Sequence, residues 1–99
     1  MKGIHYSFSA ADIAAASRAL SALAEDFSSY MAEDPGLRST LLDIYGLINR
    51  LRNPEPTFTI GEMQNICLAL ETVLEKNPMD WNASRLFSAL VPLCGYTSE

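Results

Sequence analysis

The sequence predicts an all-α fold, namely a four-helix bundle built from two antiparallel helical hairpins, with a short extended arm at the N-terminus. Two stretches fifty positions apart, SFSAADI at 7–13 and TFTIGEM at 57–63, share the pattern of a capped helix start. Apolar residues after each start recur every three or four positions, which is the spacing of one helix face. Pro35 and Pro78, each preceded by an acid or an amide, are typical of tight turns that lead into a second helix. Two hairpins of this kind bury their apolar faces against each other as a bundle.

The composition fits one small domain over residues 1–99, with the hairpins at about 9–53 and 58–95. Hydrophobic residues make up 48% of the chain and charged residues 19%, which is typical of a chain that folds. The net charge of -5 disfavours a nucleic-acid or anionic membrane partner, because such binding needs a basic patch. No apolar run approaches the roughly 18 residues of a membrane span, and the first residues do not resemble a signal peptide. We therefore expect a cytoplasmic protein.

The first helix begins within SFSAADI. Ser9 is placed to cap the first turn with its hydroxyl, and the carboxylate of Asp12 can reach back to the cap. Phe8 and Ile13 occupy the two positions of a hydrophobic staple. The helix must end before Pro35, because proline disfavours helical geometry in the residue that precedes it. Its apolar stripe contains Ile13, Ala16, Leu20, Leu23, Ala24, Phe27, Tyr30 and Met31.

The second helix is predicted to begin after the cap residue Asp34 and to end near Arg52, before the two prolines of NPEP. Its main seam has the alternating four-three spacing of a helix packed along its length: Leu37, Leu41, Ile44, Ile48 and Leu51. Leu42, Tyr45 and Leu47 widen the apolar arc to about 220 degrees. One neighbouring helix cannot cover an arc of that width.

TFTIGEM opens the third helix in the same way as SFSAADI opens the first. Thr59 is the predicted cap and Glu62 its partner in a capping box, with Phe58 and Met63 as the corresponding staple. The predicted buried face carries Ile60, Met63, Ile66, Cys67, Leu70, Val73 and Leu74.

The fourth helix is predicted to follow directly, with Asn77 as its cap and Pro78 in its first turn. Pro92 is expected to loosen or end the last turn, Gly95 to stop the helix, and the tail at 96–99 to fray. The predicted buried face contains Met79, Leu86, Phe87, Leu90 and Leu93.

The two hairpins match each other at an offset of fifty in their first helices and forty-five in their second helices. Phe8 aligns with Phe58, for example, and Leu41 with Leu86. This match is either an internal duplication or the common outcome of one helical period and one set of capping rules. The predicted architecture is the same in both cases.

No catalytic, cofactor-binding or metal-binding residues are predicted. His5 is the single histidine, in an arm whose alternating apolar residues suggest a short extended segment, and the sequence supplies no partner for a general base or a metal ligand. Cys67 and Cys94 are expected to be buried free thiols. Glu71 and Glu75 are expected to face solvent, because the Glu-x-x-His pairs of a di-iron bundle are missing.

An alternative function rests on the arginines. Arg38, Arg50 and Arg52 lie on or at the end of the second helix, and Arg18 and Arg85 lie on other helices. Guanidinium groups gathered from several helices can bind a carboxylate in a fork. The alternative is therefore a small helical enzyme, or a binder of a carboxylated small molecule. Ordinary surface arginines would instead point separately into solvent.

The favoured function is protein–protein contact, because apolar residues remain after the bundle is assembled. The candidate partner-binding residues are Leu42, Tyr45, Leu47, Leu68 and Trp81. Aromatic side chains with a polar group are common at binding hot spots. We expect a homodimer, since self-contact is the simplest interface by symmetry. The other interpretation is that the second helix is central in the bundle and that Trp81 covers a helix end.

Overall fold

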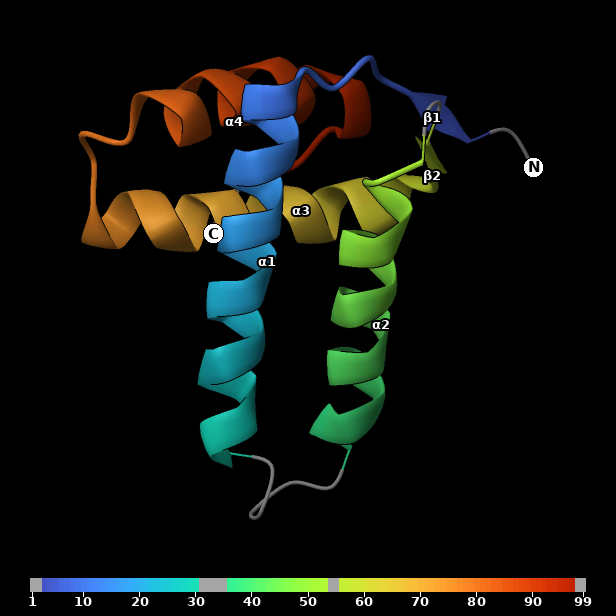
Figure 1. Ribbon diagram of the computed structural model, residues 1–99, viewed down its shortest axis with the longest axis vertical. Helices are drawn as coiled ribbons and strands as arrows, with labels where there is room; N and C mark the ends of the chain where they lie inside the picture. Colours follow the sequence, from blue (N-terminus) through green and yellow to red (C-terminus); the bar gives the residue numbers. More distant parts are fainter. Residues whose placement is uncertain (1–2, 31–35, 54–55, 98–99) are drawn as a thin grey trace.

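The computed structural model describes residues 3–30, 36–53 and 56–97, and four helices account for most of them (Figure 1). In chain order the elements are β1 (Ile4–His5), α1 (Ala10–Tyr30), α2 (Leu37–Arg50), β2 (Thr57–Phe58), α3 (Ile60–Lys76) and α4 (Trp81–Cys94). The predicted all-α class is confirmed, and the strands are two residues each. None of the helices in the described ranges combines the length and the apolar character needed to cross a membrane.

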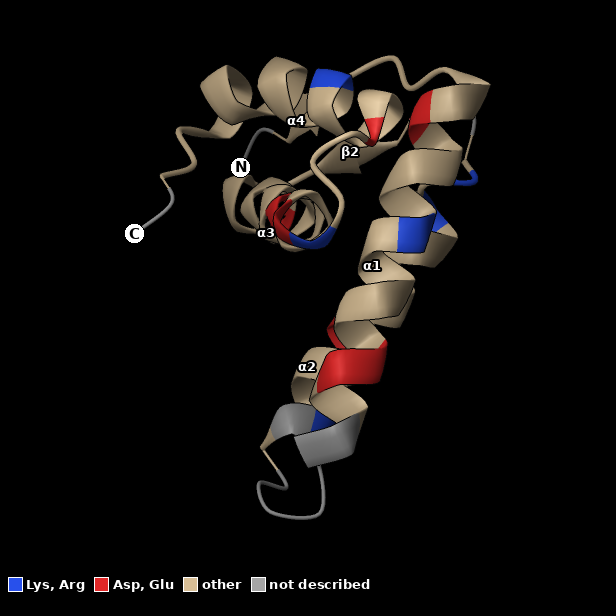
Figure 2. Cartoon of the chain, turned by 90° about the vertical axis from the view of Figure 1, so that its left-hand side faces the viewer, with Lys and Arg blue, Asp and Glu red and all other residues tan. Residues whose placement is uncertain are grey.

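The helices form two antiparallel hairpins that cross each other. Helices α1 and α2 run side by side, and the hairpin of α3 and α4 lies across one end of them (Figure 1). In Figure 2, α3 is seen end-on while α1 is seen along its length, which shows the crossing from a second direction. Helix α1 packs against all three other helices, so α1, rather than α2, is the central helix.

Small side chains explain how α1 can have three neighbours. Ala15, Ala16, Ala19 and Ala24 are all buried along it, together with Leu20 and Leu23. The distance between packed helices depends on the side chains at the contact, so alanine lets neighbouring helices lie close. The core is completed from the other elements by Leu41, Ile44, Leu47, Leu51, Phe58, Met63, Ile66, Cys67, Ala69, Leu70, Ala83, Leu86, Leu90 and Cys94.

Both predicted capping boxes are present. The Asp12 amide donates to Ser9 Oγ at 3.1 Å, and the Ser9 amide donates to Asp12 Oδ2 at 3.1 Å. At the start of α3 the Glu62 amide donates to Thr59 Oγ1 at 3.1 Å, and the Thr59 amide donates to Glu62 Oε1 at 2.8 Å. Each pair satisfies two backbone groups that the first turn of a helix leaves without an intrahelical partner.

The two similar stretches of sequence lie next to each other in space. Strand β1 pairs antiparallel with β2, with Ile4 opposite Phe58 and His5 opposite Thr57. The arm residues alternate as predicted, with Ile4, Tyr6 and Phe8 half-buried. The rings of Phe8 and Phe58 meet edge to face with centroids 6.0 Å apart. The extended arm was predicted, but its partner strand just before α3 was not.

The start of α4 corrects the sequence prediction. The helix begins at Trp81, and its cap is Asp80, whose Oδ1 accepts a hydrogen bond from the Ala83 amide at 3.1 Å. Asn77 instead closes α3, its amide donating to the Val73 carbonyl at 2.8 Å. Four residues therefore separate α3 from α4, rather than a single cap.

Several residues expected on buried faces are exposed. Met79 precedes α4 and lies in solvent, and Ile60 and Leu93 are exposed near the ends of their helices. Helix α2 ends at Arg50, two residues earlier than predicted. Some predicted features lie outside the described residues. These are Met31, the turn at Asp34 and Pro35, the side chains of Tyr30 and Leu37, and residues 98–99.

The end of α4 is more ordered than predicted. The helix continues through Pro92 to Cys94 and stops at Gly95, the predicted stop, which has a left-handed backbone with φ of 65°. The Gly95 amide donates to the Val91 carbonyl at 2.9 Å. Tyr96, in the tail that we expect to fray, has a contact with α3: its hydroxyl donates to Glu71 Oε1 at 2.8 Å.

Candidate interaction surface

Four of the five candidate partner-binding residues are exposed. Leu42 and Tyr45 on α2 have 65% and 54% of their surface exposed, Leu68 on α3 has 38%, and Trp81 at the start of α4 has 82%. Leu42 and Tyr45 are three positions apart, so they share one face of α2. Two large apolar side chains are therefore exposed within one turn of α2.

Leu47 is a correction, because it is only 2% exposed and belongs to the core. It lies three residues after Ile44 and four before Leu51, both of which are buried. The same spacing places Leu47 on the inner face of α2. The apolar arc of α2 is as wide as predicted. Its Leu47 side faces the interior of the molecule and is not available to a partner.

Two hollows connect Leu42 with Leu68. One, of about 250 Å³, lies between α2 and α3 and is lined by Leu42, Gly46 and Asn65 among others. The other, of about 290 Å³, lies between α3 and the segment after α4 and is lined by Asn65, Leu68 and Tyr96 among others. Because Asn65 lines both, the hollows adjoin. We use the name α2–α3 surface for Leu42, Gly46, Asn65 and Leu68, which line the two hollows, together with Tyr45, which lines neither hollow but lies one turn from Leu42 on α2.

Gly46 and Asn65 were not among the predicted residues. Gly46 lies four residues after Leu42, and Asn65 lies three residues before Leu68, so helical spacing alone puts each beside a candidate. A Cβ atom at Gly46 would meet no atom within 4 Å, which means that the surface is open at this position. Helical spacing from Leu42 and Leu68 could have identified both residues. They were missed because neither is apolar.

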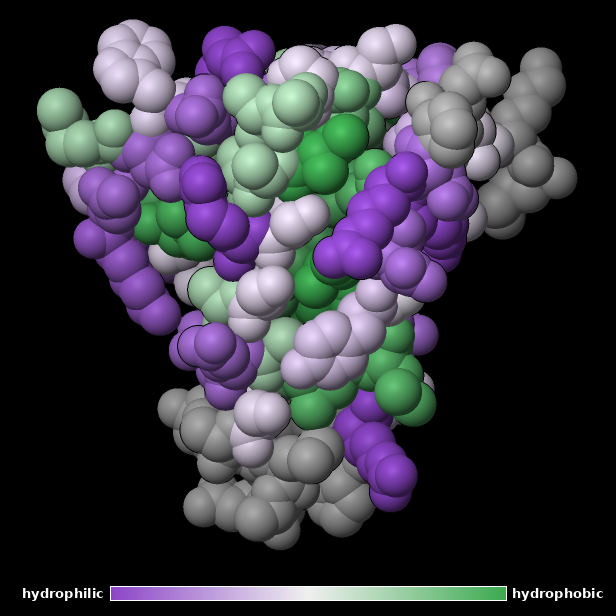
Figure 3. Space-filling model, viewed as in Figure 1, coloured by the Kyte–Doolittle hydropathy of each residue, from purple (hydrophilic) through white to green (hydrophobic). Residues whose placement is uncertain are grey.

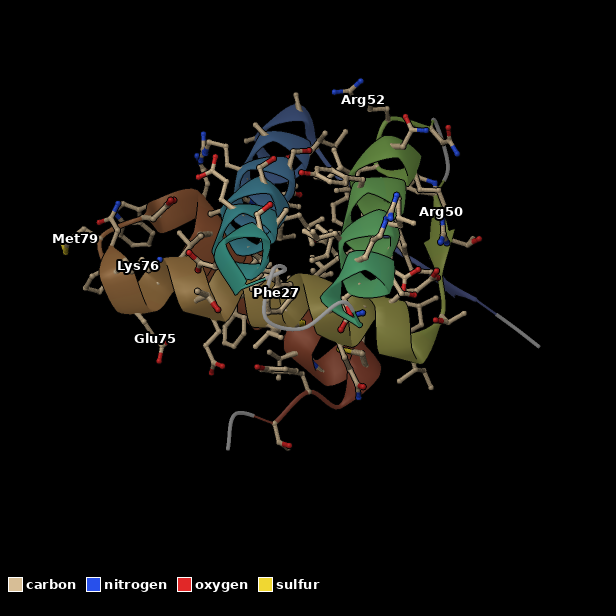
Figure 4. The ribbon with its side chains drawn as sticks, turned by 90° about the horizontal axis from the view of Figure 1, so that it is seen from below. Phe27, Arg50, Arg52, Glu75, Lys76 and Met79 are labelled. Atoms are coloured by element: carbon tan, nitrogen blue, oxygen red, sulfur yellow. The ribbon has the colours of Figure 1, made fainter. Side chains whose placement is uncertain are left out.

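Trp81 belongs to a different part of the molecule. It lines a separate small hollow with Pro78, Met79 and Ser84. Met79 marks the end of the α3–α4 hairpin that is remote from α2 and from Arg50 (Figure 4). The structure therefore does not bring Trp81 together with Leu42 and Tyr45.

An ion pair at the edge of the α2–α3 surface joins the two helices. Arg50 Nη1 donates to Glu62 Oε1 at 2.9 Å, and Arg50 Nη2 donates to Glu62 Oε2. The Arg50 guanidinium also lies 5.5 Å from the centre of the Phe58 ring. Hydrogen bonding to Arg50, assisted by the Thr59 backbone, lowers the pKa of Glu62 to about 2. The same bond raises the pKa of Arg50, so both groups are held in their charged forms.

The arginines do not form a common pocket. Arg85 Nη2 donates to the buried Asp12 Oδ1 at 3.2 Å, and Arg18 Nη2 lies 3.9 Å from Asp80 Oδ2. Arg50 and Arg52 leave the end of α2 in different directions (Figure 4). Three guanidinium groups are thus each matched to a different carboxylate of the chain. Arg38 and Arg52 have no ion pair with another described residue.

Arg52 lines a groove on another face of the molecule. The groove has a volume of about 390 Å³ and is lined by His5, Ser7, Phe8, Ile13, Leu51, Arg52, Asn53 and Pro56. Its position is where the N-terminal arm, the start of α1 and the end of α2 meet. Figure 3 shows hydrophobic side chains along the line where α1 and α2 lie side by side, bordered by hydrophilic ones. The groove combines apolar walls with a cation.

Charged side chains elsewhere give no further site. Among the residues that the structure describes, acidic and basic positions are spread over several helices, and this view shows no basic face (Figure 2). Glu71 accepts the bond from Tyr96, and Glu75 points into solvent (Figure 4), so the two do not act as a pair. Across the described part of the chain, no three His, Cys, Asp or Glu residues gather in a way that would hold a metal ion.

Comparison of the chain with protein-family models, with curated proteins and with solved structures finds no match in any of the three.

Proposed function

We propose that this protein is a small helical protein–protein interaction module of the cytoplasm, without catalytic activity, and that it binds through the α2–α3 surface. The observation that carries the proposal is the exposure of Leu42 and Tyr45 on one face of α2, at 65% and 54%. Burying such side chains against a partner is favourable by about 25 cal/mol per Å² of apolar surface. Tyrosine is also among the residues most enriched at binding hot spots.

The surroundings of this face suit a protein partner. The Arg50–Glu62 ion pair and Asn65 lie at its border, beside Leu42, and supply polar groups where solvent would meet an interface. An apolar centre with a polar rim is the usual arrangement of protein interfaces. The two hollows have volumes of about 250 and 290 Å³ and lie at the surface, which suits a protruding side chain of another protein.

A second copy of the chain is the partner that we propose. Tyr45 and Gly46 are consecutive on α2 and lie about 100° apart around the helix, on either side of Leu42. A Cβ atom at Gly46 would meet no atom within 4 Å. In a two-fold dimer the same patch faces itself, and we propose a symmetry axis beside Leu42 that brings each Tyr45 ring to the partner's Gly46. Glycine at this position would then provide the room that the aromatic ring needs.

Size-exclusion chromatography with light scattering tests the proposal directly. We expect the wild-type protein to be a dimer at micromolar concentration and the Tyr45→Asp variant to be a monomer. Gly46→Gln should also give a monomer, because its side chain would fill the space left for the ring. Met79→Asp is the matched control: it adds the same charge at an exposed apolar site remote from α2 and should leave the dimer intact.

The outcomes separate the possibilities. A wild-type monomer would remove the homodimer proposal, and so would a Tyr45→Asp protein that stays dimeric. Far-UV circular dichroism of each variant should match the wild type, so that loss of association is not mistaken for unfolding. A Trp81→Asp variant tests whether the end of α4 takes part; we expect no change, because Trp81 lies away from the α2–α3 surface.

A second candidate function, the binding of a carboxylated small molecule, is favoured by the groove at Arg52. Arg52 supplies a guanidinium without an ion pair to another described residue, and Phe8, Ile13 and Leu51 supply apolar walls. A ligand with a carboxylate head and a hydrocarbon tail fits both features.

Heteronuclear NMR titration with octanoate tests this function. Amide shifts should appear at Ile13 and Leu51 and be lost in Arg52→Gln. Arg38→Gln, which removes an exposed arginine at the other end of α2, should keep them. Shifts that are absent from the wild type, or that survive Arg52→Gln, would contradict the second function.

A further inference from the structure

Two buried cysteines far apart in the sequence meet between α3 and α4. Cys67 lies in the middle of α3 and Cys94 in the last turn of α4, and both are buried free thiols. Their Sγ atoms are 3.7 Å apart although the residues are 27 positions apart in the chain. The sequence predicted buried free thiols, but it contained no signal that they would be neighbours.

Contacts on both sides of the thiol pair fix the end of α4 against α3. One turn before Cys67, Gln64 Nε2 donates to the Cys94 carbonyl at 3.0 Å. One turn after it, Glu71 Oε1 accepts from the Tyr96 hydroxyl at 2.8 Å. Three successive turns of α3 therefore hold the end of α4, and the two sulfur atoms face each other across the middle one.

We propose that Cys67 and Cys94 are a reversible oxidation site, which forms an intramolecular disulfide when the protein meets a peroxide. The disulfide would join the end of α4 covalently to the middle of α3. This inference does not depend on the proposed function, because neither cysteine lies on the α2–α3 surface. Closing the bond requires the sulfur atoms to approach from 3.7 Å to about 2.05 Å.

Cys94 is the thiol that reacts first. Burial raises the pKa of the Cys67 thiol to about 12, and the thiolate is the reactive form. Cys67 is fully buried, whereas Cys94 keeps 6% exposure next to the end of its helix at Gly95. A peroxide therefore approaches Cys94 more easily than Cys67.

The chemistry balances with hydrogen peroxide as the oxidant. The Cys94 sulfur attacks one peroxide oxygen, the O–O bond breaks, and the departing hydroxide leaves as water with the proton of the thiol. The Cys67 sulfur then attacks the sulfenic sulfur of Cys94, the S–O bond breaks, and a second water leaves with the Cys67 proton. Two thiols lose two electrons in total, and one peroxide is reduced to two waters. Contact between the sulfurs lets this second step compete with further oxidation of Cys94.

Thiol counting by mass spectrometry tests the proposal. The reduced wild-type protein is treated with hydrogen peroxide, unfolded in denaturant and alkylated with N-ethylmaleimide. We expect the reduced protein to take up two equivalents and the oxidised monomer none, with a mass lower by two hydrogen atoms. Dithiothreitol should restore both thiols. The oxidised monomer should melt at least about 5 °C above the reduced one, because the cross-link restricts the unfolded chain.

The Cys94→Ser variant is the matched control. Its remaining thiol, Cys67, should still be alkylated after the same treatment, because it is buried and has no thiol partner. The proposal would be overturned by a wild type that keeps both thiols, by cross-links between molecules, or by a Cys94 that carries extra oxygen atoms. These results come from the wild-type protein itself, so they hold even if a variant folds poorly.

Discussion

At the scale of single residues, two carboxylates each serve a helix end and a contact between helices. Asp12 accepts from the Ser9 amide with one oxygen and from Arg85 of α4 with the other. Glu62 caps α3 through Thr59 and binds Arg50 of α2. The local role of each acid was predictable from the capping pattern. The arginine partners were not, because they come from helices that only the fold brings near.

The Glu62 carboxylate gives a prediction about acid stability. Its pKa in the folded protein is about 2, below the ordinary 4.5, because Arg50 and the Thr59 backbone bind the charged form. The stabilisation is therefore complete above about pH 4.5 and is lost as the pH falls from there towards 2. In Glu62→Gln, the free energy of unfolding should be lower at neutral pH and should fall less steeply with acid.

Urea unfolding at a series of pH values between about 5 and 2.5 measures this difference. Glu25→Gln, which changes an exposed carboxylate on α1, is the control and should keep the wild-type slope. Equal slopes for the wild type and Glu62→Gln would show that the ion pair does not contribute to acid stability.

At the scale of elements, most differences between the predicted and the observed helices lie at the helix ends. Asp80 caps α4 with its side chain, whereas Asn77 closes α3, so the turn between them is longer than the Asn-Pro pair suggested. Pro92 lies in the last turn of α4 without ending it: the helix continues to Cys94, and the Gly95 amide donates to the Val91 carbonyl. Gly95 then takes the left-handed backbone that glycine adopts without steric cost.

Two glycines in different elements give predictions of opposite sign. Gly95→Ala should lower the free energy of unfolding by about 1 kcal/mol, because a Cβ atom is disfavoured at its φ of 65°. Gly46→Ala should raise it by about 0.5–1 kcal/mol, because Gly46 lies inside α2 with no atom near the new Cβ.

Urea denaturation at a low protein concentration, where association does not contribute, measures both changes. The pair forms its own control, since the chemical change is identical and only the backbone environment differs. A stabilised Gly95→Ala would contradict the left-handed end of α4, and a destabilised Gly46→Ala would contradict an open position on α2.

At the scale of the whole molecule, the crossing of the two hairpins determines which apolar residues remain outside. Helix α1 lies against three neighbours, and its buried alanines allow this. Helix α2 is peripheral, so its second apolar face, with Leu42 and Tyr45, stays exposed. The interpretation that α2 is central in the bundle is therefore wrong, and the remaining exposure is what the proposed function uses.

The net charge of -5 gives a prediction about association that rests on the proposed dimer. Two copies of an acidic protein repel each other, while apolar contacts are insensitive to screening. The dissociation constant of the dimer should therefore fall roughly a few-fold as salt is raised from low to moderate ionic strength. Analytical ultracentrifugation at several salt concentrations measures it. A dimer that weakens with salt would indicate an interface held by ion pairs instead.

Sequence patterns predicted four helices, both capping boxes, the extended arm and the stop at Gly95, although the start of α4 and the end of α2 were misplaced. Each depends on residues within a few positions of one another, and local backbone geometry and the helical period act over that range. The same reasoning found Leu42 and Tyr45 as surplus apolar residues, but it misplaced Leu47, since a wide apolar arc does not say which edge meets a neighbour.

The contacts between distant parts of the chain are visible in the tertiary structure alone. It paired β1 with β2, brought Cys67 to Cys94, matched Arg85 with Asp12 and separated Trp81 from α2. These contacts join residues that are distant in the chain, and they follow from the crossing of the hairpins. That crossing depends on how small and large side chains of four helices fit together, which no pattern within one helix records.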